Sequence, residues 1–193
     1  MIKIEVVFVN SKKEYYLVYN DCWLYVLLLT TLAILIQSLK SYHFYLFSYP
    51  INYGKLLLPG VYFLSNFILK KYDYKKSIVG IAVSGVISIS FVAILSYLMG
   101  KNLILTKSCG DFCGYVVSQF VNLMIYHFLW EHSKRNYLLV LLTYFVSIII
   151  YFMFYSLIYL PILLEDGFWM QYFITLLLEF VICIVVAYYD WIN

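Results

Sequence analysis

Long apolar stretches alternate with short polar clusters along most of the chain. Six of these stretches approach the roughly 20 apolar residues that a helix needs to cross the hydrocarbon core of a bilayer. They cover residues 22–38, 56–69, 78–99, 112–130, 137–160 and 168–189. Charged residues gather between the stretches and do not recur every few positions, as a solvated surface requires. The pattern predicts an all-α integral membrane protein, a bundle of six transmembrane helices.

The second stretch is short, although the residues before it, 43–53, are also apolar. This combined run is interrupted by four residues that disfavour a regular helix, namely Pro50, Asn52, Gly54 and Pro59. A proline removes a backbone donor and clashes with the preceding turn, so we expect the second helix to be kinked or broken. Non-helical backbone at this depth needs cover from protein or a wet cavity, which makes the break a pointer to a binding site.

The first 21 residues follow a different pattern. Apolar residues alternate at Ile2, Ile4, Val6 and Phe8, and a polar stretch separates them from residues 15–19. This is typical of a weak hairpin or an extended tail. A signal peptide is not indicated, because the segment lacks a basic start, an apolar core and a small-residue cleavage site. We therefore divide the chain into an N-terminal tail or hairpin, residues 1–21, and a six-helix transmembrane domain, residues 22–193.

Composition and charge narrow the class of protein. With 65% hydrophobic and 12% charged residues, a soluble domain of 193 residues could not cover its apolar surface. The net charge of +3 arises mostly in the loops, and without a continuous basic face it gives no nucleic-acid surface. If the N-terminus is cytoplasmic, nine of the 13 basic residues lie on the cytoplasmic side, and the other four are Lys40, Lys55, Lys101 and Lys107. Because basic residues favour the cytoplasmic side, both termini are predicted there.

Metal and catalytic chemistry have little basis in the sequence. The four cysteines (Cys22, Cys109, Cys113 and Cys183) lie in or beside apolar segments, where a free thiol behaves as a small hydrophobe. Cys109 and Cys113 are one helical turn apart, but no histidine or second cysteine pair has zinc-ligand spacing. The apolar stretches hold no catalytic triad, HExxH motif, phosphate loop or carboxylate pair. We predict neither an enzyme nor a metal or cofactor site.

The last stretch contains an ionisable residue near its middle, Glu179. Such a group costs at least about 2.5–3.5 kcal/mol at the bilayer centre, so it needs a partner or a wet cavity. Gln171, Thr175 and Cys183 lie at four-residue steps from it and share its helical face. One interpretation is a polar stripe facing a central cavity. The other is a protonated carboxyl that joins helices by hydrogen bonds and serves packing alone.

The fourth stretch repeats this arrangement. Tyr115, Gln119, Asn122 and Tyr126 follow at steps of four, three and four, again on one helical face. Two amides between two phenols could recognise a flat, hydrogen-bonding ring, and interhelical amide hydrogen bonding is the alternative. Tyr62, Ser65 and Asn66 cluster on one side of the second stretch and could complete a pocket. In the third stretch, small residues predict close helix packing, within the bundle or in a homodimer; they are Gly80, Ser84 and Ser88.

Two of these stretches carry a family resemblance. The run LLPGVYFLSN from Leu57 to Asn66, with KYDYKK after it, resembles the "P-x-x-Y-x-x-S-D" helix and "E-x-Y-G-Y-K" exit of the vitamin-uptake-transporter family. Ser118 to His127 resembles the family's "S-Q-x-x-D-x-x-x-F-H" helix, and a basic loop follows. The chain departs from the family at Asn66 and Asn122, where Asp is usual, and at Glu179, near which the family often has Lys.

Characterised members of that family import queuosine precursors. The resemblance therefore implies import of a 7-deazaguanine base such as queuine across the inner membrane of a bacterium. The ring's donor edge would meet carboxyl or amide oxygens, and aromatic faces would stack on it. The substrate-binding residues expected in the pocket are Tyr62, Ser65, Asn66, Tyr115, Gln119, Asn122, Tyr126, Thr175 and Glu179.

Two other functions stay open on the sequence. The first is a substrate-binding subunit of a vitamin importer that partner ATPases energise; of its Ala-x-x-x-Ala docking surface only Ala33 is present. The second is a non-transporting structural membrane protein, whose buried polar groups serve packing alone. In all three interpretations the protein lies in membrane lipid. A small-molecule solute is the partner of the carrier and of the importer subunit.

Overall fold

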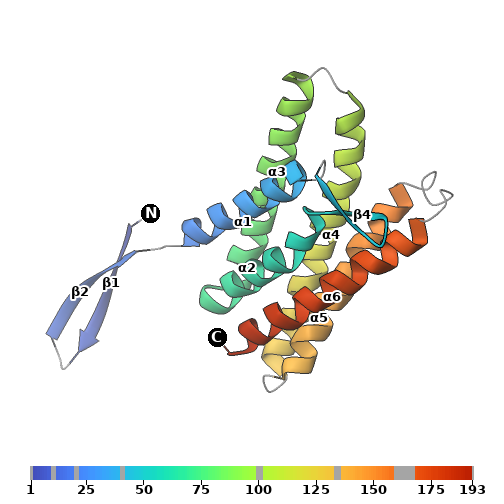
Figure 1. Cartoon of the computed structure of the whole chain (residues 1–193). Helices are drawn as coiled ribbons and strands as arrows, with labels where there is room; N and C mark the ends of the chain where they lie inside the picture. The colour runs from blue at the N-terminus through green and yellow to red at the C-terminus, as the bar shows by residue number, and fades with distance from the viewer. Residues whose placement is uncertain are drawn as a thin grey trace.

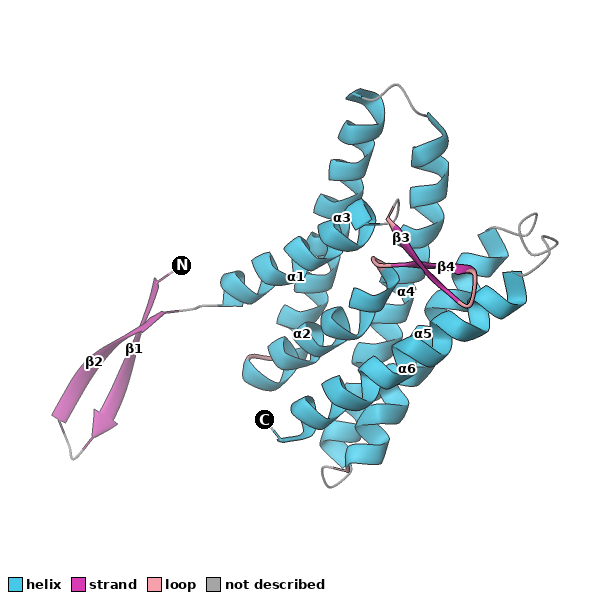
Figure 2. Ribbon diagram, viewed as in Figure 1, coloured by secondary structure: helices cyan, strands magenta, loops and turns pink. Residues whose placement is uncertain are grey.

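A computed structural model describes residues 2–9, 12–19, 22–39, 42–98, 102–132, 136–158 and 168–192, with side chains in 22–39, 42–98, 112–131, 136–156 and 169–192. A helical bundle follows an N-terminal hairpin, and a second small hairpin lies between the first two helices (Figures 1 and 2). The elements in order are β1 (Ile2–Val9), β2 (Lys12–Tyr19), α1 (Cys22–Ser38), β3 (His43–Leu46), β4 (Tyr49–Asn52), the 3-10 turn η2 (Lys55–Leu57), α2 (Leu58–Lys71), α3 (Tyr74–Leu98), α4 (Asn102–His132), α5 (Tyr137–Ile158) and α6 (Phe168–Ile192).

The bundle exposes apolar side chains and buries polar ones together with an apolar core. Large apolar side chains such as Val86, Leu142 and Val185 are 54–66% exposed, whereas Gln119 and Glu179 are fully buried. This reverses the arrangement of a soluble protein and suits a surface that faces lipid. Within the described residues, four helical segments are long and apolar enough to cross a membrane: Tyr74–Leu98, Phe112–Glu131, Tyr137–Ser156 and Trp169–Ile192. The predicted all-α, multi-pass membrane bundle is confirmed at this level.

Helices α1 and α2 are shorter, at 17 and 14 residues. At 1.5 Å per residue they measure about 26 and 21 Å, less than the roughly 30 Å of hydrocarbon. α2 nevertheless packs against α1, α3, α4, α5 and α6. Eight of its residues are buried, including three of the predicted site residues, Tyr62, Ser65 and Asn66. The shortest of these helices is therefore the central one.

The apolar run before α2 predicted a kinked or broken helix, and the structure has a β-hairpin and a 3-10 turn there. Strands β3 and β4 pair antiparallel from His43↔Asn52 to Leu46↔Tyr49, with Pro50 inside β4. The two-residue turn has positive φ at both positions, 50° at Phe47 and 70° at Ser48, as a type I′ turn requires. Pro59 falls in the first turn of α2, where its missing N–H needs no partner. Pro50 thus lies within the hairpin and Pro59 at the start of α2, and neither bends a continuous helix.

Two contacts fix this hairpin segment to the bundle. The Gln171 side chain on α6 donates from Nε2 to the Pro50 carbonyl oxygen over 2.6 Å. Gly54 lies against the end of α1, where a Cβ atom would come within 2.3 Å of the Ile36 carbonyl oxygen. A glycine is needed at this crossing because no larger residue fits against the backbone.

Gly54→Ala should lower the free energy of unfolding by about 1–3 kcal/mol, the usual cost of overpacking a tight contact. Thermal unfolding in detergent measures it. Gly60→Ala is the matched control, because a Cβ there meets only the Leu32 side chain at 3.8 Å and alanine favours a helix over glycine by about 1 kcal/mol. We expect Gly60→Ala to leave stability unchanged or raise it. Equal effects of the two substitutions would show that Gly54 is not tightly packed.

The small residues of α3 pack inside the bundle. A Cβ on Gly80 would lie 3.3 Å from Val26 Cγ2 of α1, and the side chains of Ser84 and Ser88 are buried. Helix α3 contacts both α1 and α4. Close approach of neighbouring helices within the bundle therefore accounts for these small residues. Packing within the bundle was the first of the two interpretations of the sequence.

The N-terminal segment is a hairpin. Strands β1 and β2 pair antiparallel in register from Ile2↔Tyr19 to Val9↔Lys12. Figure 1 shows this hairpin standing apart from the helices. In the described residues 2–9 and 12–19, the strands are paired as in the hairpin that the sequence allowed.

Candidate functional site

All nine residues expected to bind substrate are buried. The most exposed of them, Thr175, shows only 4% of its surface. They come from α2 (Tyr62, Ser65 and Asn66), from α4 (Tyr115, Gln119, Asn122 and Tyr126) and from α6 (Thr175 and Glu179). α2 lies between α4 and α6 in contact with both. The three polar faces predicted from residue spacing are thus turned inward.

Tyr62 joins these faces at the centre of the bundle. Its hydroxyl donates to the Ser147 carbonyl oxygen of α5 over 3.3 Å. The same phenol lies beside Ser118 of α4 and within electrostatic range of Glu179 on α6 and Tyr115 on α4. Its ring also contacts the Tyr144 ring of α5, edge to face at 6.2 Å. One phenol of α2 therefore meets polar groups of three other helices.

Helices α2 and α4 are linked by two polar pairs. Asn122 donates from Nδ2 to Asn66 Oδ1 over 2.8 Å. The Ser65 hydroxyl lies 3.0 Å from Gln119 Oε1 and 2.9 Å from the Tyr62 carbonyl oxygen, so its single hydrogen serves one of the two at a time. One turn before Gln119 on α4, the Tyr115 hydroxyl lies 3.4 Å from the Ser84 hydroxyl of α3. These contacts hold the amides in fixed orientations.

Several polar atoms in the same layer remain without a hydrogen bond. No described residue supplies a partner for Gln119 Nε2, Asn122 Oδ1 or either carboxyl oxygen of Glu179. Leaving a buried polar group unpaired costs about 1–3 kcal/mol, and more for a charged one. Native proteins pair nearly all such groups, so a cluster of exceptions calls for an explanation. Together they offer one amide donor, one amide acceptor and one carboxyl group to a bound molecule.

Thr175 and Tyr126 lie at the edges of this layer. The Thr175 hydroxyl donates to the Gln171 carbonyl oxygen of its own helix over 2.8 Å, one turn before Glu179. Tyr126 stacks on Trp130 at 6.2 Å, and the Lys70 ammonium lies 5.7 Å from the centre of its ring. Tyr126 therefore belongs to the end of the bundle near Lys70, whereas Gln119, Tyr62 and Glu179 belong to its middle.

A buried ion pair closes that end, and the sequence analysis did not predict it. Lys70 Nζ lies 2.5 Å from Asp190 Oδ1 and from the Asp190 carbonyl oxygen, with the two side chains 10% and 0% exposed. The Tyr144 hydroxyl donates to the other carboxyl oxygen of Asp190 over 2.9 Å. Asp190 lies three turns from Glu179 on the same face of α6, with buried Cys183 and Ala187 between them. Steps of four residues through Cys183 and Ala187, followed by a step of three, would have indicated Asp190.

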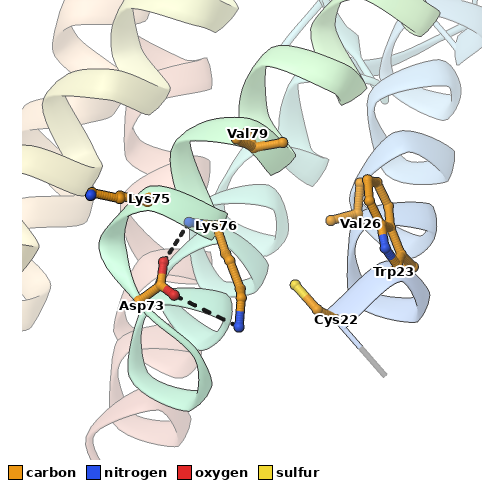
Figure 3. A pocket seen from close by; sticks show the side chains of 7 residues that line it. All are labelled: Cys22, Trp23, Val26, Asp73, Lys75, Lys76 and Val79. Carbon is orange, nitrogen blue, oxygen red and sulfur yellow. Dashed lines mark hydrogen bonds and ion pairs between the residues drawn. The ribbon is translucent and has the colours of Figure 1, made fainter. Parts of the chain in front are cut away.

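A separate surface cleft of about 370 Å³ lies between the start of α1 and the start of α3 (Figure 3). Cys22, Trp23 and Val26 of α1 line one wall. Across from them, the Asp73 carboxylate accepts a hydrogen bond of 2.6 Å from the Lys76 backbone N–H and pairs with the Lys76 ammonium at 3.7 Å. Because Asp73 already caps the first turn of α3, this cleft has no unpaired group comparable with those of the central layer.

The central layer combines hydrogen-bonding edges with aromatic faces. Gln119, Asn122 and Glu179 can bond the edge of a flat ring, while Tyr62 and Tyr115 lie beside them. This chemistry can hold a heterocycle by hydrogen bonds at its edge and by ring contacts. Comparisons with protein-family profiles, with curated proteins and with solved structures find no match to this chain.

Proposed function

We propose that the chain is a membrane carrier of the vitamin-uptake-transporter type that imports a queuosine precursor, a 7-deazaguanine base such as queuine, through a pocket between α2, α4 and α6. The observation that carries this proposal is the group of buried, unpaired atoms on Gln119, Asn122 and Glu179. A flat base with donor and acceptor groups on its edge would pair them. Such a solute would also stack on the tyrosines of the same layer.

Six crossings of the membrane agree with the contacts of α2 and α6. The Gln171 side chain bonds Pro50 near one end of α6, and Lys70 bonds Asp190 near the other. The chain from Pro50 to Lys70 therefore extends alongside α6 from Gln171 to Asp190. On this proposal the hairpin, the turn and α2 together form one crossing. α1 starts beside Asp73 and Lys76 and ends beside Gly54, so it also runs from one side to the other.

The arrangement of lysines supports a chain with both ends in the cytoplasm. Lys70, Lys71, Lys75 and Lys76 gather where α2 turns into α3. The start of α1 and the end of α6 lie on this same side of the bundle, through the cleft at Cys22 and the ion pair of Asp190. Basic residues favour the cytoplasmic side, so in a bacterial carrier we expect both termini on the cytoplasmic side of the inner membrane.

A non-transporting membrane protein is the second candidate, and the α2–α4 contacts favour it. Asn66 with Asn122, and Ser65 with Gln119, are paired across two helices, as polar groups that serve packing alone would be. Glu179 favours the carrier over the packing role, because its carboxyl oxygens have no such partner among the described residues. A packing role explains the two pairs but gives no reason to keep an unpaired carboxyl at 0% exposure.

Uptake of labelled queuine by cells that depend on this carrier tests the proposal. Gln119→Ala should reduce initial uptake by about tenfold, the factor that corresponds to roughly 1.4 kcal/mol of lost binding. Glu179→Gln should reduce it by at least as much. Gln37→Ala is the matched control, because Gln37 lies at the end of α1 outside the layer. Wild-type uptake in both site variants would refute the assignment of the site.

A further inference from the structure

The surface cleft between α1 and α3 lies where a membrane-crossing segment ends. The long apolar segment of α3 begins at Tyr74, and the α3 residues that line the cleft are Lys75, Lys76 and Val79. Lysines at the end of an apolar span lie at the level of the lipid headgroups. Trp23 on the α1 wall is 57% exposed and belongs to a residue type that anchors at this level. The cleft therefore lies at the boundary between headgroups and hydrocarbon.

The cleft has an apolar part and a basic part. Trp23 of α1 and Val79 of α3 line the apolar part, and both are at least half exposed. Asp73 and Lys76 line the cleft where α3 begins, and Figure 3 shows the Lys76 side chain extending toward Cys22 of α1. The cleft volume of about 370 Å³ is at the lower end of the range for ligand pockets, roughly 300–1,000 Å³. A molecule with an apolar tail and an anionic head matches both parts.

A second lysine lies beside the same end of the cleft. The ammonium groups of Lys71 and Lys76 are 5.5 and 5.2 Å from the centre of one ring, that of Tyr72. Lys71 also donates to the Tyr25 hydroxyl of α1 over 3.2 Å. Tyr25 and Tyr72 each precede a residue that lines the cleft. Two ammonium groups from different helices therefore meet around one aromatic ring at the edge of the cleft.

Asp73 does not neutralise this basic group. Its carboxylate lies 3.7 Å from the Lys76 ammonium, and the two side chains are 47% and 44% exposed. An exposed ion pair of this kind contributes little to stability, so the ammonium can turn to another anion at small cost. Lys71 and Lys75 add two further positive charges. The local charge therefore stays positive.

We propose that this cleft binds one anionic phospholipid, with the headgroup phosphate on Lys71 and Lys76 and an acyl chain along Trp23 and Val79. Basic pockets between helices at a membrane surface hold anionic headgroups. A soluble phosphate would leave the apolar part empty, and a zwitterionic lipid would bring a cation against the lysines. A lipid bound here would join the start of α1 to the turn between α2 and α3. It would serve a carrier and a non-transporting membrane protein alike.

Fluorescence of Trp23 reports occupancy of the cleft. The full-length protein is reconstituted in phosphatidylcholine vesicles with increasing fractions of phosphatidylglycerol whose acyl chains are brominated, because bromine quenches a nearby indole. Trp23→Phe gives the signal of the other tryptophans. The association constant at Trp23 should be about tenfold higher for phosphatidylglycerol than for brominated phosphatidylcholine, the factor that corresponds to roughly 1.4 kcal/mol. Equal constants for the two lipids would overturn the proposal.

Three variants assign the preference to the lysines of the cleft. Lys76→Gln should lower the association constant for phosphatidylglycerol about fivefold, as expected for one lysine near an anionic surface. Asp73→Asn should raise it, because it removes a repelling charge while asparagine caps a helix as well as aspartate does. Lys55→Gln is the matched control, since Lys55 also lies over a ring, 3.8 Å from the centre of Tyr155, but precedes α2 at its other end. Equal effects of Lys55→Gln and Lys76→Gln, or weaker binding in Asp73→Asn, would refute the site.

Inorganic phosphate distinguishes a lipid from a soluble anion. In detergent solution without other phospholipid, phosphatidylglycerol should raise the apparent melting temperature of the wild-type protein, because it binds the folded state. Inorganic phosphate at the same concentration should not. Stabilisation by inorganic phosphate equal to that by phosphatidylglycerol would overturn the assignment to a lipid. The uptake assay is a separate test, because neither lipid measurement uses the transported solute.

Discussion

Replacing Asp190 by Asn or Ala should lower the free energy of unfolding by about 3–5 kcal/mol, because it leaves the buried Lys70 ammonium without its counter-ion. Lys70 and Asp190 are 10% and 0% exposed, so water cannot replace the lost contact. The carboxylate also accepts a hydrogen bond from Tyr144, and that hydroxyl would lose its partner too. Thermal or denaturant unfolding of the purified protein in detergent measures the loss.

Two further variants show whether charge or hydrogen bonding dominates. The double variant Lys70→Met/Asp190→Leu removes both charges and should recover most of the lost stability, since buried ion pairs replaced by apolar residues are often neutral or stabilising. Tyr144→Phe removes one hydrogen bond and should cost about 1 kcal/mol. A double variant as unstable as Asp190→Ala would refute the ion-pair explanation and assign the effect to packing at the end of α6.

The ion pair restricts movement of α2 relative to α6. Lys70 and Asp190 tie the end of α2 to the end of α6, and Tyr144 adds α5 to the same contact. In the proposed carrier, a solute passing from the central layer toward that end would have to separate them. In a carrier that rocks one group of helices against another, such a contact marks a closed side. If the chain is the carrier proposed above, the Lys70–Asp190 pair and the unpaired atoms of the central layer would lie on one solute path.

The polar faces could be predicted because a helix repeats every 3.6 residues. Residues four or three apart in an apolar run share a face, and a face that contains Gln119, Asn122 and Glu179 cannot point to lipid. The structure buries all nine predicted site residues. The apolar runs gave the approximate positions of the helices for the same reason, since a lipid-facing segment needs all its backbone groups bonded internally.

Pairing of strands and contacts of single side chains with other helices were not predictable from residue spacing. The β3–β4 hairpin depends on the pairing of His43 with Asn52 and on a Phe47–Ser48 turn, and neither residue of that turn is a usual choice for positive φ. Lys70 and Lys55 were counted as loop charges that set orientation. In the structure one pairs with an acid 120 residues away and the other lies on the rings of α5. Long side chains at helix ends reach inward in ways that sequence periodicity does not encode.

Glu179→Leu should raise the free energy of unfolding by about 2–3 kcal/mol while abolishing uptake, because it removes a carboxyl that costs this much near the bilayer centre. The side chain has no hydrogen bond to a described residue, so leucine forfeits no such contact. Lys55 keeps its contacts with Tyr155 and Phe152. Unfolding in detergent and queuine uptake in cells are measured on the same variant. A gain in stability with a loss of function is the expected signature of a group retained for binding.

The opposite result would identify the carboxyl as a packing group. If Glu179 joined helices by hydrogen bonds, leucine would leave its partners unpaired and lower the unfolding free energy by about 1–3 kcal/mol. Thr30→Val is the control for burial of a polar side chain away from the layer, since the Thr30 hydroxyl bonds the Val26 carbonyl oxygen of its own helix over 2.8 Å. Its effect should be smaller than about 1 kcal/mol, because a threonine bonded back to its own helix adds little to stability. The sign of the Glu179→Leu effect thus decides between a carrier with a solute site and a membrane protein whose polar core serves only its fold.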